Sequence, residues 1–455
     1  MRNLICLSVG GSLLLLTEVG TAVEPVPPLL QVPFDGTVPG KLGEDSTFVE
    51  GRLGQALLTA EGKVGATLPL PENNLPARGT VMFWVCPPEE LRHRQEARRW
   101  TLLQMDGPWG LRLTLAETSH LALQVRWKTQ EGQQERIGFD YTHWKGGKWY
   151  HLTFTWNAAT GEATLYLGGR IQRRRFGLPW TPTKPPTRLR IGASGLPVDD
   201  LRVYSLMLGE ADIAAVARLT PADRPTDEGL VVYNRAIDVE PYRGDLLYEN
   251  DFSGDVSDWI LEGPGRVEIR NGWLYMESKK PTENGHIVLW NKRDFPDSFL
   301  AEWEFSPAYE EGLCIVFFAA KGRQGEDLFD PALPPRDGTF RQYIKGAINA
   351  YHISYFRNIR QPTGQCNLRK NFGFYLVSIG KDPILPRGGL GPYRLTLFKR
   401  GAHIQFGIDG RLIIDFVDDG QTYGPVLGGG KIGLRQMAPT KAYYDNFRVY
   451  AVRGQ

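Results

Sequence analysis

Cysteine, net charge and long hydrophobic runs are all scarce in this sequence of 455 residues. Of its four cysteines, Cys6 lies in the N-terminal apolar run and Cys86, Cys314 and Cys366 remain. An odd remainder excludes a complete disulfide framework, although Cys314 and Cys366 are a candidate pair within the second half. The formal net charge is only +2. That near balance argues against a nucleic-acid partner.

Several catalytic motifs are also missing from the sequence. It contains no HExxH run, no paired CxxC motifs and no glycine-rich loop that ends in the lysine of a phosphate-binding site. These patterns supply zinc ligands and phosphate cradles in the enzymes that use them. Zinc proteolysis and nucleotide chemistry are therefore excluded as leading interpretations.

The N-terminus has the pattern of a secretory signal peptide. Arg2 supplies a positive charge, Leu4 to Leu16 form a short apolar run, and Gly20-Thr21-Ala22 offers small residues for cleavage. The apolar run is too short to cross a bilayer comfortably, so no membrane span is predicted. We expect residues 1–22 to be removed and the protein to be secreted or periplasmic. An uncleaved anchor is the alternative.

Aromatic residues and turn formers are plentiful. The chain has 12 Trp, 18 Tyr and 21 Phe, with 52 Gly and 32 Pro, a mixture typical of short strands joined by tight turns. The segments 81–85 and 301–305 alternate as strands with one face in a core. A single helix is predicted over 210–218, with Gly209 as its N-cap. The composition predicts an all-β fold.

The sequence repeats itself once at long range. Four segments match in order: 149–154 with 392–397, 165–170 with 406–411, 189–192 with 431–434, and 199–204 with 445–450. Gly168-Gly169 and Asp409-Gly410 supply the positive φ angles of tight hairpins. A period this long indicates a whole domain used twice. We predict domains over 23–219 and 245–455, joined by a proline-containing linker over 220–244.

The first half resembles the laminin G-like, concanavalin A-like domains. The resemblance lies in 199–204, which a short helix follows, and in 148–153, which matches a central strand of those domains. It covers roughly 32–217 and implies a β-sandwich. Domains of this kind bind sugars, bind proteins or pack against a neighbour, so the resemblance implies a fold more than a function.

The second half resembles domain-of-unknown-function family 1961, the YesU-like proteins. Segments 312–318, 327–330, 349–357 and 367–377 carry the resemblance, which extends over most of 245–453. It implies a second concanavalin A-like sandwich and an association with polysaccharide degradation. Together the two resemblances predict two concanavalin A-like jelly-roll sandwiches in tandem. Tyr375 departs from the family pattern, which has His there. If that His takes part in the chemistry, either Tyr375 acts as base or acid in its place or the activity is lost.

A candidate site lies on two segments of the second half. If 351–357 is a strand, His352 and Ser354 share one face, and Tyr351, Ile353 and Tyr355 face the core. On the next strand one face is unusually polar. We predict a shared exposed surface whose sugar-binding side chains are Ser354, Arg357, Asn367, Arg369 and Asn371. The alternative is a solvated face without a ligand.

Two catalytic interpretations remain open on that surface. Glu302 and Glu304 alternate around Trp303, as the carboxylate pair of a retaining glycosidase does. His352 and Tyr375 are the candidate bases of a lyase, in which Arg369 and Asn367 neutralise a uronate carboxylate. Plain polar alternation also explains the two glutamates.

Other charged residues suggest secondary features. Asp327, Asp330 and Asp337 are candidate oxygen ligands of a structural calcium ion; no other metal and no cofactor are predicted. Basic clusters at 92–99 and 173–175 are expected in loops, where they attract an anionic glycan or are merely solvated. The sequence therefore predicts an exported protein that acts on a polysaccharide or oligosaccharide by hydrolysis or elimination. A non-catalytic glycan-binding protein and a structural cell-surface protein are the alternatives.

Overall fold

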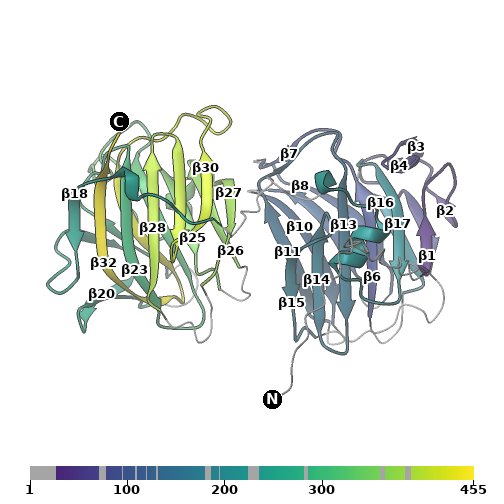
Figure 1. The fold of residues 1–455 in the computed structure, drawn as a ribbon, viewed down its shortest axis with the longest axis horizontal. Coiled ribbons are helices and arrows are strands. Elements are labelled where there is room, and N and C mark those ends of the chain that lie inside the picture. The colour runs from purple at the N-terminus through teal and green to yellow at the C-terminus, as the bar shows by residue number, and fades with distance from the viewer. Residues whose placement is uncertain are drawn as a thin grey trace, which may run out of the picture.

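The computed structural model shows two β-sandwiches arranged side by side (Figure 1). It describes residues 27–70, 78–94, 96–107, 110–118, 120–129, 132–179, 186–193, 195–223, 235–280, 285–358, 364–384 and 391–454. The predicted signal peptide lies outside the described residues. Each sandwich consists of one eight-stranded and one seven-stranded antiparallel sheet. The predicted fold class is confirmed.

The first sandwich packs its two sheets around one hydrophobic core. Its eight-stranded sheet has the order β15 (Arg170–Arg175), β14 (Glu162–Leu167), β13 (Tyr150–Asn157), β6 (Arg78–Val85), β17 (Val198–Tyr204), β4 (Gln55–Thr59), β3 (Ser46–Glu50), with β1 (Leu30–Val32) beside β17. Its seven-stranded sheet has the order β11 (Gln134–Tyr141), β10 (Leu121–Lys128), β9 (Arg112–Glu117), β8 (Arg98–Met105), β16 (Arg188–Ala193), β5 (Ala66–Pro69), β2 (Lys41–Leu42). The short strands β7 (Leu91–Arg92) and β12 (His143–Trp144) pair with each other.

The second sandwich repeats this arrangement. Its eight-stranded sheet has the order β20 (Gly265–Arg270), β21 (Trp273–Ser278), β32 (Lys441–Val452), β23 (Phe299–Pro307), β28 (Tyr393–Arg400), β29 (His403–Ile408), β30 (Arg411–Val417), with β18 (Arg243–Asn250) beside β32. Its seven-stranded sheet has the order β19 (Trp259–Glu262), β22 (Ile287–Asn291), β31 (Lys431–Met437), β24 (Leu313–Gly322), β25 (Ile348–Tyr355), β26 (Gln365–Asn371), β27 (Tyr375–Lys381). A second core fills the space between them.

The internal repeat corresponds to equivalent strands in the two sandwiches. The closing segments 199–204 and 445–450 lie in β17 and β32, which occupy the same place in their sheets. The matching hairpins are β14–β15 and β29–β30. At their turns Gly169 and Gly410 have φ of 72° and 74°, which fits the two-residue turns predicted from the sequence.

Helices are few and short in the described part of the chain. The predicted helix is present as α1 (Glu210–Val216), and Gly209 is its N-cap. It covers Met82, so β6 is buried on both faces rather than on the one face that alternation predicts. The other helical segments are α2 (Phe340–Ile344), η1 (Pro221–Asp223) and η2 (Glu240–Tyr242). Neither α-helix has the length or hydropathy that crossing a bilayer requires.

Three features differ from the sequence predictions in detail. The end of the predicted linker packs on the second sandwich, because Ala236 bridges to Arg411 and Val239 joins a small apolar cluster there. Cys314 and Cys366 are free and buried, so the candidate disulfide is not formed. The 173–175 cluster lies in strand β15 and not in a loop. The 92–99 cluster lies partly in strands β7 and β8.

Candidate functional site

Strand β25 presents the two faces that alternation predicts. Tyr351, Ile353 and Tyr355 belong to the core between the sheets. His352 and Ser354 therefore lie on the opposite, outer face of the seven-stranded sheet. This part of the sequence prediction is confirmed.

The polar residues of β26 lie on the same face. His352 is the cross-strand partner of Arg369, and Ser354 is the partner of Asn367. Directly paired residues of antiparallel strands project to the same side of the sheet. Asn371 completes the group, because its Nδ2 lies 2.8 Å from His352 Nδ1. The structure thus brings His352, Ser354, Asn367, Arg369 and Asn371 together.

This group is buried, whereas the sequence prediction placed it on an exposed surface. His352 is 2% exposed, Arg369 4% and Asn371 1%. The segment 323–347, which includes α2, folds over the sheet, and its Leu328 and Tyr343 form a small apolar cluster with Phe317 and neighbouring side chains of the sheet. The prediction of exposure is wrong because alternation shows which face of a strand a side chain occupies, and not whether another segment covers that face.

A buried ion pair holds this cover in place. The Glu262 carboxylate accepts hydrogen bonds from Arg336 Nη2 at 2.7 Å, Tyr343 OH at 2.7 Å and Trp290 Nε1 at 2.9 Å. Arg336 also donates to the carbonyl of Leu328. These contacts join the sheet to the segment 323–347 at several points, so the cover is part of the folded sandwich.

His352 is a neutral imidazole in this environment. Burial, followed by the charges of Arg369, Arg435 and Arg357, lowers the pKa of His352 well below its ordinary value. Phe317 and Phe374 flank its ring. Asn371 Oδ1 and Arg435 Nη1 are buried without a hydrogen-bond partner. This face therefore carries polar atoms whose hydrogen bonds no described group of the protein satisfies.

The remaining predicted catalytic residues lie elsewhere. Tyr375 packs on Tyr423, with ring centroids 4.4 Å apart, and on His93 of the first sandwich at 4.5 Å. It pairs with Lys370 across β26 and β27, which places it on the other face from Arg369. The grouping of Tyr375 with His352 as two bases at one site is not what the structure shows.

Glu302 and Glu304 lie on the eight-stranded sheet of the second sandwich. Trp303 is in the core, so the two glutamates do share one face as predicted. Glu302 binds Arg243 and Arg394, each at 2.9 Å, and Glu304 lies near Asn446. The sequence interpretation put both catalytic schemes on one sheet. That interpretation is wrong, because the glutamates and His352 belong to different sheets.

Arg369 connects the buried face to the first sandwich. Its Nη1 donates to the carbonyl of Phe374 at 2.8 Å, and its Nη2 lies 3.5 Å from His120 Nδ1. His120 Nε2 in turn lies 3.2 Å from Asp140 Oδ1. Gln365 Nε2 donates to the carbonyl of Asp140. The two sandwiches therefore meet through polar contacts at the β26 end of one sheet and the β11 end of the other.

A cleft of about 540 Å³ opens beside this contact. The second sandwich contributes Arg357 and Gln365, and the first contributes the outer face and edge of its seven-stranded sheet together with β15. The polar side chains that line it are Arg99, Thr118, His120, Gln124, Arg126, Arg136, Asp140, Arg173, Arg175, Arg357 and Gln365. We call this cavity the interdomain cleft.

The charge of the interdomain cleft is strongly positive. Six arginines line it, and Arg173 stays a cation near neutral pH although burial lowers its pKa to about 10. Burial alone raises the pKa of Asp140, but His120, Arg357 and Arg369 outweigh it and hold the pKa below its ordinary range. Asp140 is thus ionised and is the one carboxylate among the described residues that line the cleft. Arginine outnumbers it there several-fold.

The candidate calcium ligands are engaged in other contacts. Asp327 binds Lys431 at 2.8 Å and accepts from the backbone N–H of Phe329. Asp330 and Asp337 accept from backbone N–H groups two residues later in the chain. Within the described ranges, no three acidic, histidine or cysteine side chains group as a metal site.

Comparison with known proteins gives the family of the second sandwich. The family described as "Domain of unknown function (DUF1961)" matches residues 245–449. The uncharacterized protein YesU of Bacillus subtilis (strain 168) is 45% identical over 217 residues, which is 46% of this chain and 98% of that protein. The chain belongs to the DUF1961 family. Residues 61–214 match the concanavalin A-like lectin/glucanases superfamily.

Solved structures similar to this DUF1961 protein include two from Bacillus subtilis. One is a protein of unknown function with a galectin-like fold, at 44% identity, covering 46% of this chain and 97% of that one, with a TM-score of 0.45. The other is the carbohydrate-binding module CBM66, at 15% identity, covering 43% and 96%, with a TM-score of 0.29. Neither description states what this chain binds.

Sequence reasoning found only part of the first sandwich's contribution to the cleft of this DUF1961 protein. The basic clusters 92–99 and 173–175, expected to attract an anionic glycan or to be solvated, supply Arg99, Arg173 and Arg175. His120, Gln124, Asp140 and Gln365 were not singled out, and Arg435 was not linked to His352. A further signal was the alternation of arginines in β9 to β11, which put Arg112, Arg126 and Arg136 at outward positions. That alternation identifies an outer face but not the neighbour that faces it.

Proposed function

We propose that this protein binds a carbohydrate in the interdomain cleft. Support comes from the convergence of planar hydrogen-bonding side chains from both sandwiches around one cavity. Amides such as Gln124 and Gln365 and guanidinium groups such as Arg126 and Arg357 match the closely spaced hydroxyl and carboxylate oxygens of sugars. A cavity of about 540 Å³ is of the size that takes a small ligand or part of a chain.

The charge pattern favours binding over hydrolysis. Glycoside hydrolysis generally uses two carboxyl groups that flank one glycosidic bond. Asp140 is the sole described carboxylate of the cleft, and Glu302 and Glu304 lie on another sheet. Glu302 is also held by two arginines. Glycan binding without cleavage is therefore the function that this geometry supports best.

Calorimetric titration of the full chain with a panel of neutral and acidic oligosaccharides tests this proposal. Gln124→Ala and Arg357→Ala should each weaken binding by about tenfold, since each removes hydrogen bonds to the ligand. Arg411→Ala serves as the matched control, because Arg411 is exposed at the β30 hairpin turn outside the cleft. Failure to bind any glycan, or equal affinity of all three variants, contradicts the proposal.

Elimination from a uronate polymer is the second candidate function. The observation that favours it is the pair of His120 and Asp140 in the cleft, which Arg357 also lines and which Arg369 approaches through His120. In this scheme His120 removes the C5 proton, the C4–O bond breaks, and the leaving oxygen takes up a proton. An arginine stabilises the carboxylate as charge builds on it.

The double bond formed by elimination absorbs in the ultraviolet, so a direct assay exists. His120→Ala should abolish the rise in absorbance on polyuronates, whereas His352→Ala should leave it if His352 is only a buried structural residue. Loss of turnover in His352→Ala alone would instead assign the base to the face predicted from the sequence. No rise and no new reducing ends with the intact protein would leave binding as the function.

Export of the protein is part of the proposal. It is supported by the signal-peptide pattern of residues 1–22. Mass spectrometry of protein recovered from the periplasm or medium of a bacterial host should give a mature N-terminus after Ala22. Recovery of the intact chain from the membrane fraction would favour the uncleaved anchor.

A further inference from the structure

On the outer face of the seven-stranded sheet of the first sandwich, long polar side chains form one line that runs across the strands. Cross-strand pairs link Lys41 to Thr67, Thr67 to Arg190, and Arg190 to Gln104. The same line continues through Arg112, Arg126 and Arg136. Paired residues share a face, and their neighbours Leu68, Leu103, Leu113 and Val125 are in the core. We call Lys41, Arg190, Arg112, Arg126 and Arg136 the basic row.

The positive charge of the basic row is largely uncompensated. Arg190 binds Asp106 at 3.1 Å. Arg126 Nη2 donates to the neutral Gln124, while its Nε is buried without a partner. Burial, then Arg136, Arg99 and Arg112, lowers the pKa of Arg126, so these cations lie close enough to repel one another. Lys41, Arg112 and Arg136 are exposed.

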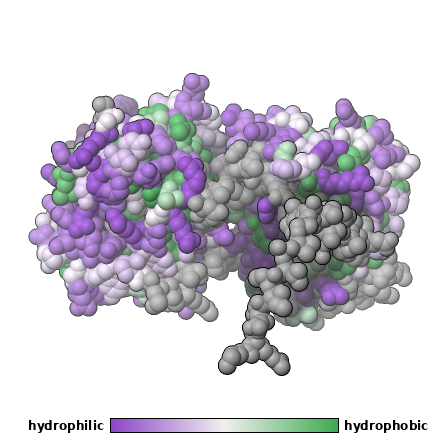
Figure 2. Space-filling view, in the orientation of Figure 1, coloured by the Kyte–Doolittle hydropathy of each residue, from purple (hydrophilic) through white to green (hydrophobic). Residues whose placement is uncertain are grey.

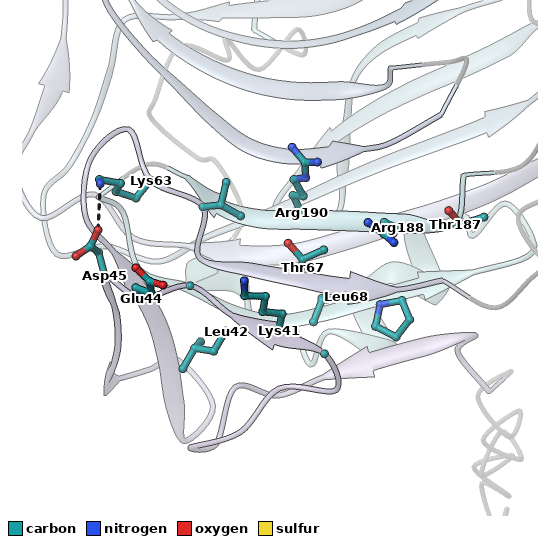
Figure 3. Close-up of a pocket in the computed structure, with 14 residues that line it drawn as sticks. Lys41, Leu42, Glu44, Asp45, Lys63, Thr67, Leu68, Thr187, Arg188 and Arg190 are labelled. Atoms are coloured by element: carbon teal, nitrogen blue, oxygen red, sulfur yellow. Dashed lines mark ion pairs between the residues drawn. The ribbon is translucent and has the colours of Figure 1, made fainter.

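A cavity lies at each end of the basic row. At the β2 edge, a hollow of about 750 Å³ is lined by Lys41, Thr67, Arg188 and Arg190, with Glu44, Asp45 and Lys63 at its rim. Figure 3 shows Lys41, Thr67 and Arg190 following one another across neighbouring strands, and Lys63 paired with Asp45 at 3.3 Å. At the β11 edge, Arg126 and Arg136 line the interdomain cleft.

We propose that the basic row binds a linear polyanionic polysaccharide that runs across the strands from the β2 hollow to the interdomain cleft. This inference rests on the proposed function and names its ligand class, a chain bearing carboxylate or sulfate groups. Together with its linking residues Thr67 and Gln104, the basic row crosses all seven strands of the sheet. At about 4.8 Å between strands it extends over about 29 Å, long enough for several sugar units in contact with one cation after another.

The shape of the row favours a polysaccharide over a nucleic acid. Single-stranded nucleic acids are usually held by aromatic side chains on which bases stack, together with a positive groove. The basic row and its two linking residues, Thr67 and Gln104, include no aromatic side chain. The net charge of the whole chain is only +2, so the positive charge is local. A narrow file of guanidinium groups matches evenly spaced anionic groups on a thin chain.

Binding of long and short ligands by row variants tests the inference. The probes are polygalacturonate, a sulfated galactan, an uncharged galactan of similar length, a galacturonate disaccharide and duplex DNA, titrated against the full chain at two salt concentrations. Arg112→Gln and Lys41→Gln should each weaken binding of the acidic polymers by about tenfold and reduce its salt dependence. Binding of the disaccharide should not change, because the cleft alone holds it.

Controls separate charge from folding. Arg112→Lys keeps the charge and should retain most of the affinity for the polymer. Arg78→Gln is the matched control, because Arg78 is exposed on the eight-stranded sheet of the same sandwich. Weaker binding with an unchanged melting temperature assigns the effect to the row. Preference for the polyuronate or for the sulfated polymer identifies the anionic group.

The possible failures are distinguishable. Binding of the disaccharide or the uncharged galactan with no loss of polymer affinity in Arg112→Gln would overturn the basic row and leave the cleft proposal standing. The absence of binding to every glycan would overturn both. Duplex DNA bound as tightly as the acidic polymers would show a general polyanion surface and would also overturn the inference.

Discussion

The two seven-stranded sheets have the same strand order, yet only one of them leaves its outer face open. In the first sandwich this face carries exposed arginines such as Arg112 and Arg136. In the second, His352, Arg369 and Arg435 occupy the outer face and are buried. Arg369 is covered by Phe374 and meets His120 of the first sandwich. For the rest of this face the difference arises in one connection. Residues 106–111 join β8 to β9, whereas 323–347 join the equivalent β24 to β25 and fold over the sheet.

A shared fold therefore does not determine which of its faces is free to bind. The two sandwiches share the order of their strands, and each packs its sheets around one main core. A longer connection converts a solvated face into a second small core, and the polar groups beneath it then require partners such as those of Glu262. The open face keeps its charges in water, where they are available to a ligand. In Figure 2 the viewed surface of the C-terminal sandwich is mostly hydrophilic, with apolar residues singly or in small groups.

The largest expected contrast concerns arginines on the two outer faces. Arg336→Ala removes the buried partner of Glu262 and should destabilise the second sandwich by about 3 kcal/mol. Arg112→Ala, on the open face of the first, should change stability by less than about 0.5 kcal/mol. Urea unfolding followed by tryptophan fluorescence measures both. Equal losses of stability would show that the buried Arg336 contributes no more to folding than the exposed Arg112.

A smaller contrast concerns the aspartates that begin the closing repeat segments. Burial raises the pKa of Asp199 from 3.8 to about 6, and also raises that of Asp445, which is less buried. The folded state then holds the proton more tightly than the unfolded state. Ionisation of Asp199 therefore lowers the free energy of unfolding. The loss begins near pH 3.8 and is complete above about pH 6.

Neutral replacements at these two positions reveal that cost. Asp199→Asn should gain up to about 2 kcal/mol of stability relative to wild type when the pH rises from 4 to 8. Asp445→Asn should gain less. Melting temperatures of both variants and of the wild type at the two pH values provide the measurement. A relative stability of Asp199→Asn that is the same at both would contradict the assignment.

The smallest contrast is between the matching hairpin turns. Gly410→Ala should cost about 1 kcal/mol, the strain of a side chain at positive φ. Gly169→Ala should cost somewhat more, because an added Cβ would lie 2.7 Å from Leu219 Cδ1, whereas the space at Gly410 is open. Thermal unfolding of the two variants measures the difference. A lower cost at Gly169 would mean that the Leu219 side chain moves aside to accommodate the added methyl group.

Much of the architecture follows from the printed residues. Alternation around Trp303 and along 351–355 gave the correct core faces, and the repeated closing segments gave two equivalent sandwiches. The candidate site was predictable only in part. The pairing of His352 with Arg369 followed from alternation on neighbouring strands, but the position of Tyr375 did not, because a register shift between Leu368 and Arg369 changes the side it occupies.

The sequence by itself determined the local features of this protein. Alternation shows which side chains of a strand turn inward, glycine marks the tight turns, and the repeat shows that one sandwich is used twice. Tertiary structure alone decided that 323–347 covers the His352 face and that Arg369 meets His120 of the other sandwich. The physical reason is that alternation acts between adjacent residues and strands. Covering a face depends on how a whole connection folds back, and forming the cleft depends on residues as far apart as His120 and Arg369, so no local pattern specifies either approach.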